Sequence, residues 1–280
     1  MDNACPVTGI DHYENFPVAS VLCPPALRPA IVAIYYFART ADDIADEGDA
    51  PAEARLADLT AMRFELDRLY AGTDPTRGRW PAVFAPLAAA VRTHALPKAP
   101  LAALLEAFMQ DVRNPSYADR AALLDYCRRS ADPVGRLLLH LYGVHEPQAL
   151  RQADAICSAL QLINFWQDLG VDLRRGRCYV PATELATHGL ARLQAGRDDA
   201  HSKALVRDLC AWASDLMHQG APLVHRLPGR GGWELRLVVQ GGLRILETIA
   251  AMDHATLSRR PTLGARDVPR LLWRALWMRR

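Results

Sequence analysis

The sequence lacks an excess of either charge and any long apolar run, and both absences exclude classes of protein. Its 33 lysine and arginine residues nearly balance 31 aspartate and glutamate residues, so a nucleic-acid partner is not expected. No stretch approaches the roughly 18 uncharged apolar residues that a membrane span needs. The first residues, MDNACPVTGIDHYENFP, lack the basic start and apolar core of a signal peptide. We therefore expect a cytoplasmic protein.

Paired cysteines and nucleotide-binding glycine loops are missing as well. The six cysteines are scattered, with no CxxC pair and no cluster of cysteine and histidine at zinc-ligand spacing. This pattern favours reduced packing residues over a disulfide framework. No GxGxxG loop precedes a strand, which disfavours a step that uses a nicotinamide cofactor.

Strand-forming alternation of Val, Ile and Thr is also scarce, whereas Ala, Leu and Arg recur with helical spacing. Proline and glycine divide the chain into segments of ordinary helix length. With 280 residues, 50% of them hydrophobic, the chain can bury a sizeable core. It shows no internal repeat and no low-complexity linker. We predict an all-α protein with one domain, residues 1–280.

A polar stripe runs along the helix predicted around residues 161–175. Its members fall within an arc of about 80° and are Gln161, Asn164, Asp168, Asp172 and Arg175. The rest of this helix is apolar, so the stripe faces a buried site or forms a solvated outer face. Two carboxylates one turn apart on a buried face repel each other unless a cation lies between them. Carboxylate and amide oxygens suit Mg²⁺.

A second stripe of the same kind lies in the segment IYYFARTADDIADEG. Three acids, an arginine and a tyrosine share one helix face within about 100°: Tyr35, Arg39, Asp42, Asp43 and Asp46. Two helices that face each other with such stripes would hold a cluster of divalent ions. A diphosphate is the group that needs such ions with arginines nearby. The two stripes together therefore favour the buried reading and predict a Mg²⁺ site for a diphosphate.

Several further features leave two interpretations open. Arg175 either contacts phosphate or interacts with the negative end of its own helix. Asp111 is a site residue or a surface acid. Pro133 and Gly135 kink a helix beside a cavity, or they mark a break between two helices. The tail RLLWRALWMRR either rests on anionic lipid, as interfacial helices do, or packs on the core with an arginine rim.

Taken together, DDIAD and QLINFWQDLGVD with RRGRCYVP after it resemble the squalene/phytoene synthase family. The resemblance covers nearly the whole chain, because HYENFPVASVLCP, RPAIVAIYYFARTADDIADE and LLDYCRRSADPVG also come in the family's order and spacing. Within the family, HYENFPVAS and YCRRSADPVGRLLL are most similar to the hydroxysqualene synthases of hopanoid biosynthesis.

The resemblance implies an isoprenoid-synthase-type helical bundle around a central apolar cavity, with Mg²⁺ as the cofactor. The implied metal ligands are Asp42, Asp46, Asp168 and Asp172, supported by Asn164. Arg39 would bind phosphate, and Gln161 would line the metal site. The side chains expected at the entrance and along the cavity are His12, Phe16, Tyr35 and Tyr126. Phe165 joins Phe16 and Tyr35 as an aromatic face that shields positive charge.

One departure concerns the last long helix, where many members of the family carry a tyrosine near the diphosphate. Gly241 and Gly242 stand at about that place, which would leave room for a water. Arg259 and Arg260, at the far end of the same segment, are further candidates for phosphate contacts.

The resemblance implies the conversion of presqualene diphosphate and water to hydroxysqualene and diphosphate. The main alternative keeps the site but joins two farnesyl diphosphates head to head, giving presqualene diphosphate, squalene or dehydrosqualene. A third reading is a non-catalytic helical assembly factor, although such relatives tend to lose acids that are all present here. The expected partner is an isoprenoid diphosphate, with peripheral membrane contact through the basic tail and no obligate protein partner.

Overall fold

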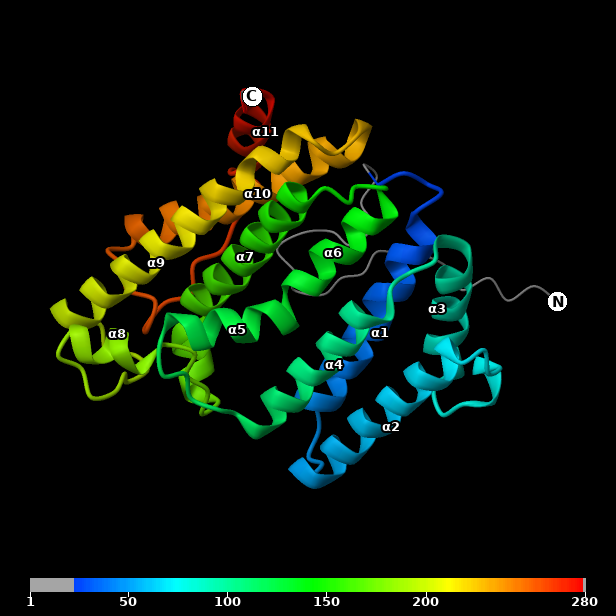
Figure 1. Ribbon diagram of the computed structural model, residues 1–280. Coiled ribbons are helices and arrows are strands. Elements are labelled where there is room, and N and C mark those ends of the chain that lie inside the picture. Colours follow the sequence, from blue (N-terminus) through cyan, green and yellow to red (C-terminus); the bar gives the residue numbers. More distant parts are fainter. Residues whose placement is uncertain (1–22, 279–280) are drawn as a thin grey trace.

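The computed structural model describes residues 23–278, and every regular element in that range is helical (Figure 1). The α-helices are α1 (Arg28–Asp46), α2 (Ala52–Tyr70), α3 (Pro81–His94), α4 (Lys98–Arg113), α5 (Arg120–Ser130), α6 (Asp132–Leu141), α7 (Pro147–Arg174), α8 (Ala182–Thr187), α9 (Ala200–Gly220), α10 (Gly229–Ala251) and α11 (Val268–Leu276). Two 3-10 turns are η1 (Pro75–Arg77) and η2 (Ala221–His225). The predicted all-α class is confirmed.

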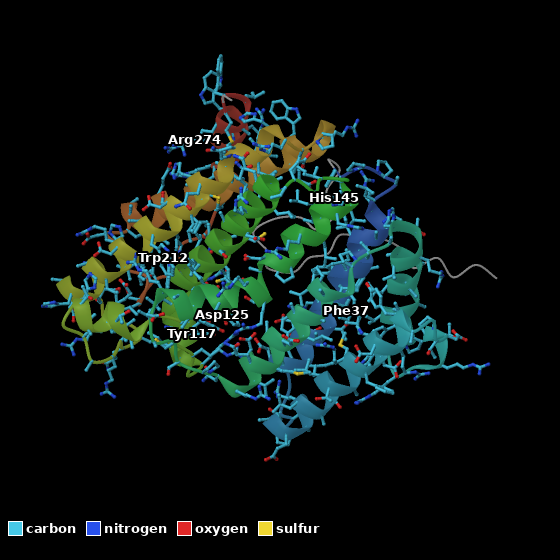
Figure 2. All side chains as sticks on the ribbon, viewed as in Figure 1. Phe37, Tyr117, Asp125, His145, Trp212 and Arg274 are labelled. Carbon is cyan, nitrogen blue, oxygen red and sulfur yellow. The ribbon has the colours of Figure 1, made fainter. Side chains whose placement is uncertain are left out.

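The buried apolar side chains form two clusters that meet at α6. The first cluster fills the space among α1, α2, α3 and α4, where the rings of Phe37 and Phe84 pack edge to face at 5.9 Å. Phe37 is labelled in Figure 2. The second lies among α5, α7, α9 and α10. Helix α6 supplies Leu137 to the first cluster and Leu139 to the second. It therefore lies between the two groups of helices, as Figure 1 shows.

Helix α1 shows how the sequence pattern produces this packing. Its buried residues recur every three or four positions: Ala30, Ala33, Ile34, Phe37, Ala41 and Ala45. That face packs on the first cluster, so the polar stripe of α1 lies on a different face of the helix. Most of the buried positions are alanines, which lets α3 and α4 approach the helix closely.

The segment around Pro133 is a break rather than a kink. Helix α5 ends at Ser130 and α6 begins at Asp132, which places Pro133 in a first turn, where its missing N–H has no helical partner to lose. Gly135 has a packing role. A Cβ atom at this position would lie 2.6 Å from the Sγ atom of Cys157. Glycine therefore lets α6 approach α7 closely.

Asp132 is a buried acid at this break, only 3% exposed, and it accepts a 2.8 Å hydrogen bond from Ser158. Burial raises the pKa of Asp132 to about 7. In the folded protein the carboxyl thus keeps its proton up to about pH 7, whereas the unfolded chain loses it near pH 4. Stability contributed by this group is present below pH 4 and is lost as the pH rises toward 7.

We therefore expect Asp132→Asn to stabilise the protein at pH 8 by on the order of 2 to 4 kcal/mol relative to wild type, and to have little effect at pH 4. Asparagine can still accept the hydrogen bond from Ser158. Urea unfolding of both proteins at several pH values measures the difference. An advantage that does not grow with pH would contradict the assignment.

The described cysteines are unpaired, and the described helices are too short or too polar to cross a membrane. Cys23, Cys127, Cys157, Cys178 and Cys210 are free thiols. Among residues 23–278, no helix combines the length and apolar character that crossing a bilayer requires.

Candidate functional site

A cavity of about 500 Å³ lies between the two groups of helices and is lined by side chains of α1, α4, α6, α7, η2 and α10. Its volume falls within the range of small-molecule sites, about 300 to 1,000 Å³. The lining is mostly apolar. Arg39 and Asp42 mark one end, while Cys23, Tyr142 and Glu234 mark the other. The cavity is thus a mostly apolar space with Arg39 and Asp42 at one end and Glu234 at the other.

Both helices that carry acidic stripes line this cavity in the same way. On α7 the lining residues are Ala153, Ile156, Cys157 and Leu160, and the polar stripe begins directly after them. On α1 the lining begins with Ile31 and ends with Asp42. Each helix therefore passes from apolar lining to acidic side chains toward its C-terminal end.

On α1, the guanidinium group of Arg39 holds the first acids. It lies 3.2 Å from Asp42, 2.7 Å from Asp43 and 2.8 Å from Glu47. Burial, and after it the neighbouring carboxylate of Asp46, raise the pKa of Asp42 to about 6 against the opposing effect of Arg39. The raised pKa shows that negative charge is crowded here.

On α7, Asp168 and Asp172 lie one turn apart near the C-terminal end. Burial, followed by the charge of Asp168, raises the pKa of Asp172 to about 6. Asp168 is ion-paired with Arg260, whose Nη2 atom lies 3.2 Å from the second carboxylate oxygen. The carboxylates of α7 thus repeat the crowding seen on α1.

Arg177 connects the two stripes. It follows α7 in the chain, yet its guanidinium donates two hydrogen bonds, of 2.7 and 2.5 Å, to the carboxylate of Asp46 on α1. These hydrogen bonds raise the pKa of Arg177. The same guanidinium charge acts on the pKa of Asp172 and of Asp42. Arg177 is therefore hydrogen-bonded to an acid of α1 and also acts electrostatically on an acid of α7.

The arginine that the stripe pattern singled out has a different position. Arg175 caps the C-terminus of α7 and is exposed. Helix α7 ends at Arg174, and Gly176 then adopts a φ of +76° and reverses the chain. Arg177 is turned back toward α1 as a result. Helical spacing cannot predict the position of Arg177, because the helix ends before this residue. Gly176, between Arg175 and Arg177, is the sequence signal that the chain turns there.

Within residues 23–278, no three acidic, histidine or cysteine side chains converge closely enough to hold a metal ion. The ion pairs explain this arrangement, because Arg39, Arg177 and Arg260 each hold a predicted ligand: Asp42, Asp46 and Asp168 respectively. The donor chemistry nevertheless fits Mg²⁺. Carboxylate oxygens are its preferred ligands, and the raised pKa values of Asp42 and Asp172 show a crowding that a divalent cation relieves.

An aromatic wall adjoins the acids. Tyr126 is 3% exposed and donates a 3.0 Å hydrogen bond to Asp111. Burial raises the pKa of Asp111 to about 7, and the nearby acids of α1 contribute in the same direction. Phe165 stacks on Tyr179 at 3.8 Å, and both rings lie about 6.2 Å from Tyr126. Asp111 is therefore a half-buried neighbour of the site and not an exposed surface acid.

The segment after α10 crosses α7 at Gly170, between the two acids. A Cβ atom at Gly170 would overlap the carbonyl oxygen of Leu257 and lie 2.9 Å from that of Thr256. The N–H of Gly170 also donates to Thr256 at 3.2 Å. This close crossing brings Arg260 onto Asp168, whereas Arg259 is exposed.

The remaining predicted residues have mixed positions. Tyr35 lines the cavity. Gln161 and Asn164 are half-buried on α7, the first directly after the last lining residue and the second one turn beyond it. Tyr126 and Phe165 belong to the aromatic wall beside the acids. His12 and Phe16 lie outside the described residues.

The expected space for a water at Gly242 is filled. A Cβ atom at Gly242 would lie 2.9 Å from the side chain of Met217 and 3.1 to 3.2 Å from those of Leu160 and Ile163. The glycine therefore allows α10 to pack closely on α7 and α9. The prediction of a vacant place at this position was wrong.

Comparison with known proteins gives a consistent result. The sequence model for squalene/phytoene synthase matches residues 11–267. A hydroxysqualene synthase from Zymomonas mobilis is 41% identical over 201 residues, which cover 70% of this chain and 65% of that protein. A hydroxysqualene synthase from Sinorhizobium fredii is 34% identical over 242 residues, covering 85% of this chain and 79% of that protein.

The fold has a solved counterpart. The crystal structure of squalene synthase HpnC from Alicyclobacillus acidocaldarius superposes with a TM-score of 0.78 at 36% sequence identity. The match covers 87% of this chain and 90% of that one. It confirms the predicted helical bundle around an apolar cavity.

Proposed function

Because the chain belongs to the squalene/phytoene synthase family, we propose that it converts presqualene diphosphate and water to hydroxysqualene and diphosphate. The observation that carries this proposal is the cavity: an apolar space of about 500 Å³ with Arg39 and Asp42 at one end. A long hydrocarbon chain fits the apolar part, and a diphosphate requires the charged end. The names of similar proteins support the choice of substrate.

The residues proposed to hold Mg²⁺ are Asp42, Asp46, Asp168 and Asp172, with the amide oxygen of Asn164. When bound, Mg²⁺ supplies positive charge that stabilises the departing diphosphate. Three of these carboxylates are paired with arginines in the structure. We propose that Arg39, Arg177 and Arg260, whose guanidinium groups lie on these carboxylates, also bind the diphosphate oxygens.

The rest of the chain protects and guides the hydrocarbon cation. The carbon–oxygen bond to diphosphate breaks, the cation rearranges, and a water adds its oxygen and loses a proton to give the alcohol. The apolar lining keeps other water away from the cation. Tyr35 in the cavity, and Phe165 and Tyr126 in the aromatic wall, offer ring faces that stabilise positive charge. No reductant takes part.

We further propose a cytoplasmic protein, with one catalytic domain, that contacts a membrane peripherally. Both the substrate and the alcohol product carry long hydrocarbon chains that partition into lipid. The part of the chain that would make this contact is described in the next subsection.

The proposed reaction is tested by incubating the purified protein with presqualene diphosphate and Mg²⁺, without NADPH, and identifying the product. We expect hydroxysqualene and diphosphate in equal amounts, and no turnover after the metal is removed with a chelator. Activity on farnesyl diphosphate alone would overturn the proposal.

That second outcome would support head-to-head coupling of two farnesyl diphosphates. One observation favours this alternative, namely that the structurally similar protein is described as a squalene synthase. Both reactions need ionisation of a diphosphate, so the same acids and arginines would serve. Product identification separates them.

A further inference from the structure

Helix α11 exposes its apolar side to solvent. Of the large hydrophobic side chains that are exposed among residues 23–278, five lie on α11 or directly after it: Val268, Leu272, Trp273, Leu276 and Trp277. Trp273 is 62% exposed and Trp277 is 57% exposed. An ordinary surface helix buries such residues and exposes polar ones. Here the arrangement is inverted, so this face requires something to cover it.

Basic residues lie beside the apolar face. Residues 259–280 contain seven arginines and one aspartate, a net charge of +6, while the whole chain carries only +2. Arg260 does not belong to this face, because it is paired with Asp168 on α7. Arg266 and Arg270 are exposed near the N-terminal end of α11. On α10, Arg236 lies over the exposed ring of Trp233, 4.7 Å from its centroid, and extends the surface beyond α11.

Ion pairs and a hydrogen bond hold α11 on α10. Arg244 of α10 lies 2.7 Å from Asp267. Glu247 of α10 is paired with both Arg270 and Arg274, the latter labelled in Figure 2. Arg236 donates a 3.1 Å hydrogen bond to the backbone oxygen of Ala275. The helix is therefore a fixed part of the molecule that presents its tryptophans in one orientation.

We infer that α11 and the adjoining part of α10 form a surface that docks onto a bilayer containing anionic lipid. Tryptophan and leucine beside arginine are the side chains that favour the boundary between lipid headgroups and acyl chains. Anionic headgroups complement the exposed Arg266 and Arg270 beside this face. A second copy of this chain would instead bring its own Arg266 and Arg270 to the same face, which opposes self-association.

The position of this surface relative to the cavity gives it a role, and this step rests on the proposed function. Helix α10 lines the cavity with Gly231, Glu234, Leu235 and Val238. Arg236 and Glu247 on the same helix contact α11. One helix thus separates the hydrocarbon cavity from the docking surface. Docking would bring the end of the cavity opposite Asp42 close to the lipid from which a hydrocarbon substrate comes and into which its product partitions.

The inference is tested by sedimenting the full-length protein with vesicles of phosphatidylcholine alone, and with vesicles in which about 30% of the lipid is phosphatidylglycerol. We expect binding to the anionic vesicles that weakens as salt is added. The double variant Trp273→Ala, Trp277→Ala should lower the partition coefficient at least about tenfold. Arg266→Gln with Arg270→Gln should weaken binding to anionic vesicles only.

Phe64→Ala is the matched control. Phe64 is an aromatic side chain that is 60% exposed, and it lies on α2, far from α11 in Figure 1. Its replacement should leave vesicle binding unchanged. Equal binding by wild type and the double tryptophan variant would overturn the inference. So would a dimer in light scattering that the double variant dissociates, because the face would then be a contact between copies.

Turnover of detergent-dispersed presqualene diphosphate distinguishes failure of docking from failure of the proposed function. The tryptophan variant should keep this activity, since neither side chain lines the cavity. Loss of vesicle binding with activity retained concerns docking alone. An inactive wild type that still binds anionic vesicles would overturn the proposed function and leave the docking surface standing.

Discussion

Replacing Asp172 with asparagine should lower kcat/KM for presqualene diphosphate by at least about a thousandfold without destabilising the protein. Asparagine keeps the shape of the side chain but removes the charge that a Mg²⁺ ligand supplies. The fold should tolerate the change, because burial and Asp168 already raise the pKa of Asp172 to about 6. At neutral pH the ionised carboxylate is therefore an unfavourable group in the folded protein, and its loss relieves repulsion.

Steady-state kinetics with Mg²⁺ in excess, together with thermal unfolding, measure the two effects. Asp154→Asn provides the control on the same helix, since Asp154 is ion-paired with Arg136 at 2.7 Å and lies 18 residues, or about 27 Å, before Asp172 along α7. It should leave kcat/KM unchanged. If Asp172→Asn retained a tenth of the wild-type activity, the carboxylate would not be a metal ligand.

Helical periodicity carried most of the correct predictions. Apolar residues recur every three to four positions, and burial follows that spacing in α1. The same periodicity grouped the acids of each stripe on one face. A polar stripe on a helix that is otherwise apolar faces either solvent or a buried polar site. Two such stripes therefore predicted helices that face each other, whereas the apolar cavity was implied by the resemblance to the family.

The failures occur where the chain leaves a regular helix. Arg177 reaches Asp46 because Gly176 turns the chain, and helical spacing carries no information past that turn. At Pro133 the sequence left both a kink and a break open, and the structure has the break, because α5 ends at Ser130 and α6 begins at Asp132. Boundaries of this kind depend on capping and on packing with distant segments, which a single sequence shows weakly.

Close packing between distant segments was the second source of error. Gly242 is a contact point of α10 with α7 and α9 rather than a vacant place. The arginine pairs of Asp42, Asp46 and Asp168 likewise involve partners from three parts of the chain. Charge patterns along one helix predict that acids need a cation. They do not predict which guanidinium groups approach them.

Gly170 is also a close contact between distant segments of the chain. Replacing it with alanine should destabilise the protein by about 2 to 4 kcal/mol. In the middle of a helix, alanine by itself is favoured over glycine by about 1 kcal/mol. The loss must therefore come from the crossing segment, where the new methyl group would overlap the carbonyl oxygen of Leu257. A backbone carbonyl cannot rotate away as a flexible side chain can, so the segment that carries Arg260 has to move.

Thermal unfolding measures the loss as a fall in melting temperature of several degrees, and kinetics should show a parallel fall in kcat/KM because Arg260, proposed to bind the diphosphate, is displaced with its segment. Gly264→Ala is the matched control, since a Cβ atom there meets nothing within 4 Å. It should leave the melting temperature unchanged or slightly raised. A Gly170→Ala protein as stable as wild type would mean that the segment after α10 does not cross α7 between the two acids, and the pairing of Arg260 with Asp168 would lose its structural basis.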